Sequence, residues 1–174
     1  MADKIIVVDD FLNKEELEKA VVIVKDLKWN WGHESKHEKR IETPFWKSEL
    51  MENEFFHLYL TSVIEQTFKK KFKVNRLYAN AHTFGQDGAY HTDCDKDNTY
   101  TLCLYLSKID PEYVETAGGH IFFKLPDVLY KLAYEPLFNR AILFPSKYIH
   151  RGCSYSRYVM DLRICVAWKL EEII

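Results

Sequence analysis

The pattern of the chain changes near Phe72, and this change does most to limit the folds that the chain can adopt. Before it, two segments carry apolar residues at helical spacing; after it, short apolar runs alternate with turns that contain glycine or proline. Helices followed by a run of strands predict an α+β protein, mainly β, in which a β-sandwich or barrel has helices packed on one side. We therefore expect helical support over about residues 13–70 and a β core over about residues 72–170.

The N-terminal part is expected to hold a short buried strand over residues 5–8, two helices and a charged segment between them. Asn13 and Glu16 have the spacing of a capping box, and the apolar residues behind them predict a helix over residues 14–28. A second helix is expected over residues 52–70. Residues 29–40 are dense in charge and follow neither period, so we interpret them as a solvated loop whose histidines are ordinary polar residues. A lid or substrate-binding loop that carries two tryptophans is the alternative.

Five strands are expected in the C-terminal part: residues 73–84, 99–106, 120–124, 140–144 and 162–169. Successive side chains of a strand point to opposite faces of its sheet, so position parity separates one face from the other. In three of these strands one face is apolar and the other is polar. The polar faces hold Tyr78, Asn80 and His82; Thr101, Cys103 and Tyr105; and Arg163, Cys165 and Ala167. Such a polar lining requires water or a ligand pocket beside it.

Arg163 stands out in this lining because it interrupts an otherwise apolar strand and therefore needs an anionic partner. A guanidinium group pairs with a carboxylate through two hydrogen bonds, so we expect Arg163 to anchor a dicarboxylate. Arg151 and Arg157 are alternative anchors, but both lie among turn-forming residues.

The run Tyr90-His91-Thr92-Asp93 places a histidine and an aspartate two positions apart, and His150 follows 59 positions after His91. Two imidazoles and one carboxylate make the facial triad of a non-heme Fe(II) centre, which leaves coordination positions open for a cosubstrate and O2. His91, Asp93 and His150 are therefore expected to be both metal ligands and catalytic residues.

Length, net charge and cysteine content limit the partners and the cellular location that we expect. At 174 residues, the chain is expected to form one domain, residues 1–174. A net charge of −2 gives no overall basic field, which argues against a nucleic-acid partner. The four cysteines form no C-x-x-C pair, so free thiols in a reducing compartment are expected. The N-terminus lacks the features of a signal peptide, and no stretch reaches about 18 apolar residues, so we expect no membrane partner and a cytoplasmic location.

Several segments, taken in order, resemble the Fe(II)/2-oxoglutarate-dependent dioxygenases, and within them the prolyl 4-hydroxylase-like branch, which includes small versions common in phages. The resemblance covers nearly everything from Ile5 to Leu170. The matching segments are residues 5–12, the H-x-D of residues 91–93, the strand of residues 101–107, the paired glycines 118 and 119, residues 143–145 with residues 150–152, and the arginine strand of residues 161–164.

This resemblance implies a double-stranded β-helix (jelly-roll, cupin-like) core with His91, Asp93 and His150 as Fe(II) ligands. It also implies that Arg163 holds the distal carboxylate of 2-oxoglutarate, helped by the hydroxyl of Tyr105.

Four positions fit the family pattern only in part. Asn80 and His82 match an N-x-Y pattern that some relatives use on the cosubstrate, with histidine in place of tyrosine. His120 follows the paired glycines where many relatives carry an acid. Prolyl hydroxylases often place a tryptophan six residues after the basic residue, whereas Trp168 lies five after Arg163 and so, by parity, on the opposite face.

The resemblance implies a hydroxylase that uses Fe(II), O2 and 2-oxoglutarate and releases succinate and CO2, with ascorbate as a candidate reductant. A proline in a peptide or protein is the expected substrate, and a free amino acid or another small metabolite is the alternative. Demethylation of nucleic acid ranks third. A non-catalytic jelly-roll binding module, or a cupin-like isomerase, is a further alternative. Such a protein would have the same fold but would not bind 2-oxoglutarate. For a phage-encoded chain the expected location is the cytoplasm of the host cell.

Overall fold

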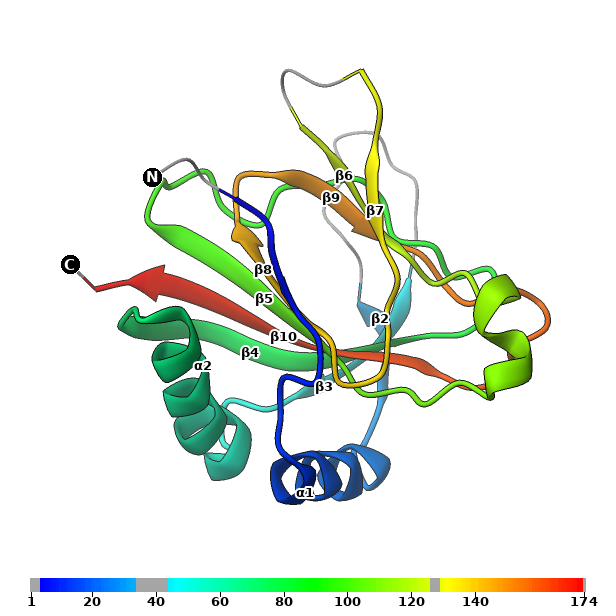
Figure 1. Ribbon diagram of the computed structural model, residues 1–174, viewed down its shortest axis with the longest axis horizontal. Coiled ribbons are helices and arrows are strands. Elements are labelled where there is room, and N and C mark those ends of the chain that lie inside the picture. The colour runs from blue at the N-terminus through cyan, green and yellow to red at the C-terminus, as the bar shows by residue number, and fades with distance from the viewer. Residues whose placement is uncertain (1–3, 34–43, 126–128, 174) are drawn as a thin grey trace.

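Two antiparallel β-sheets face each other, and two helices cover the outer face of the larger sheet (Figure 1). The computed structural model describes residues 4–33, 44–125 and 129–173. The larger sheet has the strand order β1-β8-β5-β10-β4-β3-β2, and the smaller sheet has the order β7-β6-β9. The strands are β1 (Ile6–Val8), β2 (Asn30–His33), β3 (Phe45–Glu49), β4 (Phe72–His82), β5 (Thr99–Tyr105), β6 (Ile121–Lys124), β7 (Leu132–Tyr134), β8 (Ala141–Pro145), β9 (Ile149–Gly152) and β10 (Arg163–Glu172). The expected jelly-roll architecture with N-terminal helices is confirmed.

The first helix, α1 (Lys14–Lys25), begins with the predicted capping box. Asn13 Oδ1 accepts from the backbone N–H of Glu16, and the Glu16 carboxylate accepts from the backbone N–H of Asn13, both at 3.0 Å. The helix ends three residues earlier than expected. The chain leaves it at Asp26 because Leu27 and Trp29 pack against the core instead of continuing the helix.

The second expected helix is present, but it consists of a π-helical part followed by an α-helical part. Residues Phe55–Leu60 form a π-helix, η1, which continues without a break as α2 (Thr61–Phe68). The helix ends at Lys69, whose left-handed φ of 54° closes the last turn. A short 3₁₀ helix, η2 (Pro111–Thr116), follows β5.

The main core lies between these helices and the outer face of the larger sheet. Its central side chains come from the face that parity predicted to be apolar: Leu77 and Ala79 on β4, Leu102 and Leu104 on β5, and Val166 and Trp168 on β10. Trp168 is fully buried, and its Nε1 donates to the carbonyl of Phe56 at 3.3 Å. Parity therefore placed Trp168 correctly, away from the face that carries Arg163.

A second apolar cluster lies between the two sheets and closes one end of the space between them. It joins Phe123 of β6 to Ile142 and Phe144 of β8, and Cys103, Tyr105 and Cys165 border it from the polar side. All four cysteines are free thiols, as expected.

The interpretation of residues 29–40 as a solvated loop was wrong for its first part, because residues 30–33 form β2. Strand β2 pairs with β3, and Trp31 lies opposite Trp46. A register shift at Gly32, whose φ is 105°, interrupts the two-residue alternation, and this is why the sequence pattern gave no strand signal. Residues 34–43, the rest of the expected loop or lid, lie outside the described residues.

Two strands of the smaller sheet were also missed. β7 has only three residues, and β9 reads Ile-His-Arg-Gly, without apolar alternation. Neither length nor pattern distinguishes such segments from turns. Among the described residues, no helix is long and apolar enough to cross a membrane.

Candidate metal centre and cosubstrate pocket

The polar faces of β4, β5 and β10 line a pocket between the two sheets. Its volume is about 190 Å³. We call it the intersheet pocket, and its lining includes Arg76, Tyr78, Asn80, His82, His91, Asp93, Cys103, Tyr105, His150, Arg163, Cys165 and Lys169. The predicted polar face is therefore confirmed for Tyr78, Asn80 and His82 on β4, for Cys103 and Tyr105 on β5, and for Arg163, Cys165 and Ala167 on β10. Thr101, predicted on the same face of β5, does not line the pocket and instead donates to Asp93.

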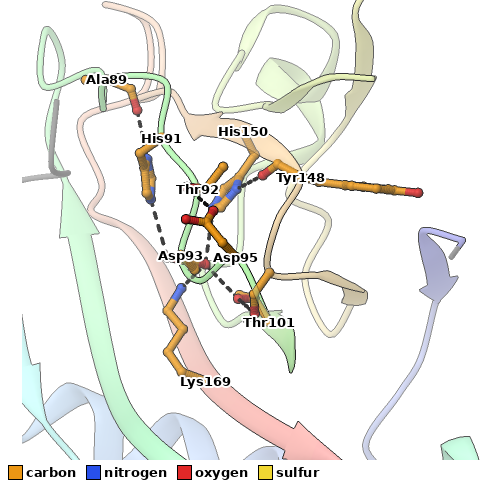
Figure 2. A network of polar contacts seen from close by, with 10 residues as sticks. Ala89, His91, Thr92, Asp93, Asp95, Thr101, Tyr148, His150 and Lys169 are labelled. Carbon is orange, nitrogen blue, oxygen red and sulfur yellow. Dashed lines mark hydrogen bonds and ion pairs between the residues drawn. The ribbon is translucent and has the colours of Figure 1, made fainter. Parts of the chain in front are cut away.

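His91, Asp93 and His150 converge at one side of this pocket (Figure 2), with potential ligand atoms all within 4.8 Å of one another. Backbone hydrogen bonds bring the two distant segments together. His91 and His150 exchange backbone hydrogen bonds of 3.0 and 2.9 Å, and the backbone N–H of Asp93 donates to the carbonyl of Ser146 at 2.9 Å. These three residues could hold a metal ion.

Both histidines present the same ring nitrogen to the centre of the triad. Nδ1 of His91 donates to the carbonyl of Ala89, and Nδ1 of His150 donates to the carbonyl of Tyr148, each at 2.9 Å. Because a carbonyl can only accept, the proton resides on Nδ1 and the lone pair of Nε2 is free to bind a metal. Burial lowers the pKa of His150 to about 4, although Asp93 beside it raises it, so this imidazole is neutral near pH 7.

The carboxylate of Asp93 is held by two donors at one of its oxygens. Oγ1 of Thr101 donates to Oδ2 at 2.6 Å, and the ammonium group of Lys169 contacts the same oxygen. Burial raises the pKa of Asp93, but Lys169, His91 and His150 lower it, and the pKa lies well below its ordinary value. Asp93 is therefore ionised, and its Oδ1 lies 3.5 Å from Nε2 of His91.

Arg163 lies deeper in the pocket, 2% exposed, at the start of β10. Its Nε donates to the carbonyl of Gly119 at 2.6 Å, and its guanidinium carbon lies 5.0 Å from the centre of the Tyr105 ring. No carboxylate among the described residues forms an ion pair with it. A buried guanidinium without an acidic partner needs an anion from outside the chain.

Gly119 is the residue that makes this contact possible. Its φ is +74°, and a Cβ atom there would lie 2.6 Å from a ring carbon of Tyr155. Only glycine fits this backbone position, so the paired-glycine turn fixes the orientation of the arginine.

Two further polar atoms at the pocket lack partners. The hydroxyl of Tyr105 and Oδ1 of Asn80 are buried and find no hydrogen-bond partner among the described residues. Burial holds the pKa of Tyr105 well above its ordinary value, so its hydroxyl stays protonated and can donate. A carboxylate between Arg163 and Tyr105 would satisfy both groups. The residues present therefore fit a metal ion with a dicarboxylate such as 2-oxoglutarate.

His82 also lines the pocket, opposite Arg163 on the neighbouring strand. Its Nδ1 hydrogen-bonds to the carbonyl of Gln86 at 2.6 Å, and its ring stacks on Phe45 at 4.6 Å. Burial, with the nearby Arg163, lowers the pKa of His82 to about 3. A neutral imidazole thus takes the position of the tyrosine in the N-x-Y pattern.

The alternative anion anchors are placed elsewhere. The guanidinium of Arg151 lies 4.9 Å from the ring centre of Tyr90 and 5.7 Å from that of Phe122, and Arg151 does not line the pocket. Arg157 is exposed. His120 lines a separate cavity beside η2 rather than the intersheet pocket.

Several residues of the pocket were not predicted from the sequence, among them Lys169, His33 and Arg76. Lys169 lies two residues beyond Ala167 on the same strand face, so parity could have found it, but nothing in the sequence indicated its contact with Asp93. His33 lines the pocket from β2 and was interpreted as an ordinary loop residue. A larger open groove of about 720 Å³ runs between α1 and η1, but none of its lining residues is a histidine or an arginine.

Comparisons with known proteins concern the fold. No family model matches the sequence, and neither does any curated protein. Solved structures do match the fold. A prolyl hydroxylase from Trichoplax adhaerens, in complex with a hypoxia inducible factor peptide fragment, has a TM-score of 0.70 at 13% identity, covering 98% of this chain and 84% of that chain. A 2OG-Fe(II) oxygenase family oxidoreductase from Burkholderia pseudomallei has a TM-score of 0.72 at 11% identity, covering 96% and 85%. A prolyl-4-hydroxylase from Pseudomonas putida has a TM-score of 0.66 at 14% identity, covering 99% and 95%. The chain thus has the fold of prolyl hydroxylases and other 2OG-Fe(II) oxygenases, with a His-Asp-His triad in its pocket.

Proposed function

We propose that this protein is an Fe(II)- and 2-oxoglutarate-dependent hydroxylase. One observation carries the proposal: three residues able to hold a metal ion face the same small pocket as a buried arginine that has no acidic partner among the described residues. A protein that only bound a metal would have no need of Arg163, because burying an unpaired guanidinium destabilises the fold.

The roles of the residues follow from their contacts. His91, Asp93 and His150 would hold Fe(II), and the bound metal would supply O2 activation for oxidation of a C–H bond. Arg163 would pair with the distal carboxylate of 2-oxoglutarate, and the Tyr105 hydroxyl would donate a hydrogen bond to it. Asn80 and His82 lie close enough on β4 to be further contacts of the cosubstrate.

The chain's own contribution to catalysis is geometry and exclusion of water. The carbonyls of Ala89 and Tyr148 fix the tautomers of the two histidines, and Thr101 fixes the rotation of the Asp93 carboxylate. The apolar cluster between the sheets shares Cys103, Tyr105 and Cys165 with the pocket lining, and its apolar side chains would limit the water beside the bound cosubstrate.

For the substrate, we propose a proline in a peptide or protein. The sequence resemblance to prolyl 4-hydroxylases supports this choice, as does the fold shared with the Pseudomonas putida prolyl-4-hydroxylase and with the Trichoplax adhaerens enzyme that was solved with a peptide. A free amino acid or another small metabolite is the alternative.

Mass spectrometry over a library of peptides that contain proline, lysine or asparagine tests the proposal. The expected product carries the mass of one added oxygen atom on proline, and succinate is released in equal amount. If oxygen is added only to lysine or asparagine, the protein is still a hydroxylase, but the assignment of proline as its substrate is wrong. Iron binding without any 2-oxoglutarate binding would instead favour a non-catalytic jelly-roll module.

A further inference from the structure

Lys169 is a buried cation in the intersheet pocket for which the proposed chemistry has no use. It lies six residues after Arg163 on β10 and faces the same side of the sheet. Its side chain is only 10% exposed, and its ammonium group contacts Asp93 (Figure 2). Burying a lysine costs free energy, and the ion pair with Asp93 offsets part of that cost.

Asp93 alone does not balance the charges of the pocket. Lys169 and Arg163 contribute two buried positive charges, and Asp93 contributes the one buried carboxylate of the lining. Fe(II) and the dianion of 2-oxoglutarate cancel each other in charge, so their binding leaves one positive charge uncompensated. An additional anion would restore neutrality in this low-dielectric site.

The neighbouring strand adds a second cation at the same place. Arg76 of β4 is exposed, but it lies directly opposite Lys169 of β10 in the sheet register, and both residues line the pocket. Like charges directly opposite each other destabilise a sheet. Arg76 forms no ion pair with a carboxylate among the described residues, whereas the nearby Lys47 pairs with Glu49 at 2.5 Å. Two opposed cations beside a pocket form a site that an anion would stabilise.

We propose that Lys169, assisted by Arg76, binds a carboxylate of the substrate beside the metal centre. This inference rests on the proposed function and narrows its substrate to molecules with a carboxylate close to the oxidised carbon. The carboxylate can be that of a free or C-terminal amino acid, or that of an acidic side chain next to the reacting residue.

Thr101 already orients the Asp93 carboxylate through the oxygen that Lys169 contacts. The competing role for Lys169 is thus to hold Asp93 and nothing more. The two roles differ in one measurable respect: a carboxylate-binding lysine makes the protein prefer an acid to the corresponding amide, and a lysine that only holds Asp93 does not.

Calorimetric titration of the anaerobic protein, loaded with Fe(II) and 2-oxoglutarate, distinguishes these roles. The probes are the N-acetyl derivatives of proline, lysine and asparagine, each as the free acid and as the primary amide. We expect the acid to bind about tenfold more tightly than the amide in at least one pair. Equal affinities in all three pairs, including no binding of either form, would overturn the inference if the aspartate and asparagine dipeptides described next also bind equally or not at all.

A second pair of probes identifies the source of the carboxylate. The capped dipeptides N-acetyl-Asp-Pro-amide and N-acetyl-Asn-Pro-amide differ only in a side-chain carboxylate. Preference for the aspartate peptide supports an acidic neighbour, and preference confined to the free acids supports a free or C-terminal amino acid.

Variants then assign the preference to Lys169. Lys169→Met should abolish the discrimination between acid and amide, and Lys169→Arg should retain most of it. Lys47→Met is the matched control: Lys47 lies 4.8 Å from the Tyr78 ring centre, as Lys169 lies 5.8 Å from it, but its charge is already paired with Glu49. An acid preference that survives in Lys169→Met contradicts the assignment.

The wild-type comparison needs no variant, so it decides the inference even if Lys169→Met fails to fold. The proposed function is checked separately in the same samples, through the visible charge-transfer absorption of an Fe(II) chelate with an α-keto acid. Absence of that absorption would reject the proposed function, whereas its presence without acid preference would reject only the role of Lys169.

Discussion

Nε of Arg163 donates a hydrogen bond of 2.6 Å to the carbonyl of Gly119, and this contact ties the start of β10 to the turn that precedes β6. It joins the two sheets at the inner end of the pocket. The arginine is thereby held with its remaining donors available, before any ligand binds.

Replacement of Arg163 by Met should weaken 2-oxoglutarate binding by at least about 100-fold, because the cosubstrate carboxylate would be buried without its ionic partner. Calorimetric titration of the Fe(II)-loaded protein with 2-oxoglutarate measures this effect. Arg157→Gln is the control, since Arg157 is exposed and does not line the pocket. Equal loss in both variants would rule out a specific anchor at Arg163.

Gly119→Ala should destabilise the fold by about 2 kcal/mol or more, because it combines a left-handed backbone with a Cβ that would lie 2.6 Å from Tyr155. Gly118→Ala is the matched control. Its φ of +68° carries the same backbone cost, but the nearest atom would be 3.6 Å away, so we expect a loss of only about 1 kcal/mol. Urea unfolding of both variants measures the difference. Equal losses of stability in the two variants would mean that the contact with Tyr155 adds nothing to the cost of a side chain at position 119.

The free energy of unfolding of the metal-free protein should decrease as the pH is lowered, and protonation of His82 should cause part of this decrease. Its pKa is about 3 in the fold against an ordinary 6.5, so the unfolded chain binds this proton first and stability rises with pH between these values. Between about pH 6 and pH 4, wild type should lose about 1.4 kcal/mol per pH unit more than His82→Gln. Urea unfolding across this range checks the slope, and parallel curves for the two proteins would show that His82 is not kept neutral by burial.

Alternation along the long strands made the pocket lining predictable from the sequence, whereas the triad was predicted from the residue types and spacing of His91, Asp93 and His150. On β4, β5 and β10 the same two-residue period separated the pocket face from the core face, and it placed Trp168 correctly in the core. Long strands carry enough residues for the period to be read without ambiguity.

Strands β2 and β9 and the contact between Lys169 and Asp93 could not be predicted, because they depend on register shifts and long-range contacts that the local sequence pattern does not show. The bulge at Gly32 shifts the register of β2 and hides its alternation, and β9 is too short and polar to be recognised. The approach of Lys169 to Asp93 joins positions 76 residues apart, which only the pairing of β10 with β5 brings together. Residue type alone could not have indicated that contact.

Succinate formation from 2-oxoglutarate by the Fe(II)-loaded protein tests the central claim most directly, with wild type compared to Asp93→Ala. We expect wild type to release succinate and the variant to lose at least about 100-fold of that rate, because removal of the carboxylate leaves only two of the three proposed metal ligands. Circular dichroism establishes that the variant is folded. Undiminished succinate release by folded Asp93→Ala would contradict the assignment of the metal centre.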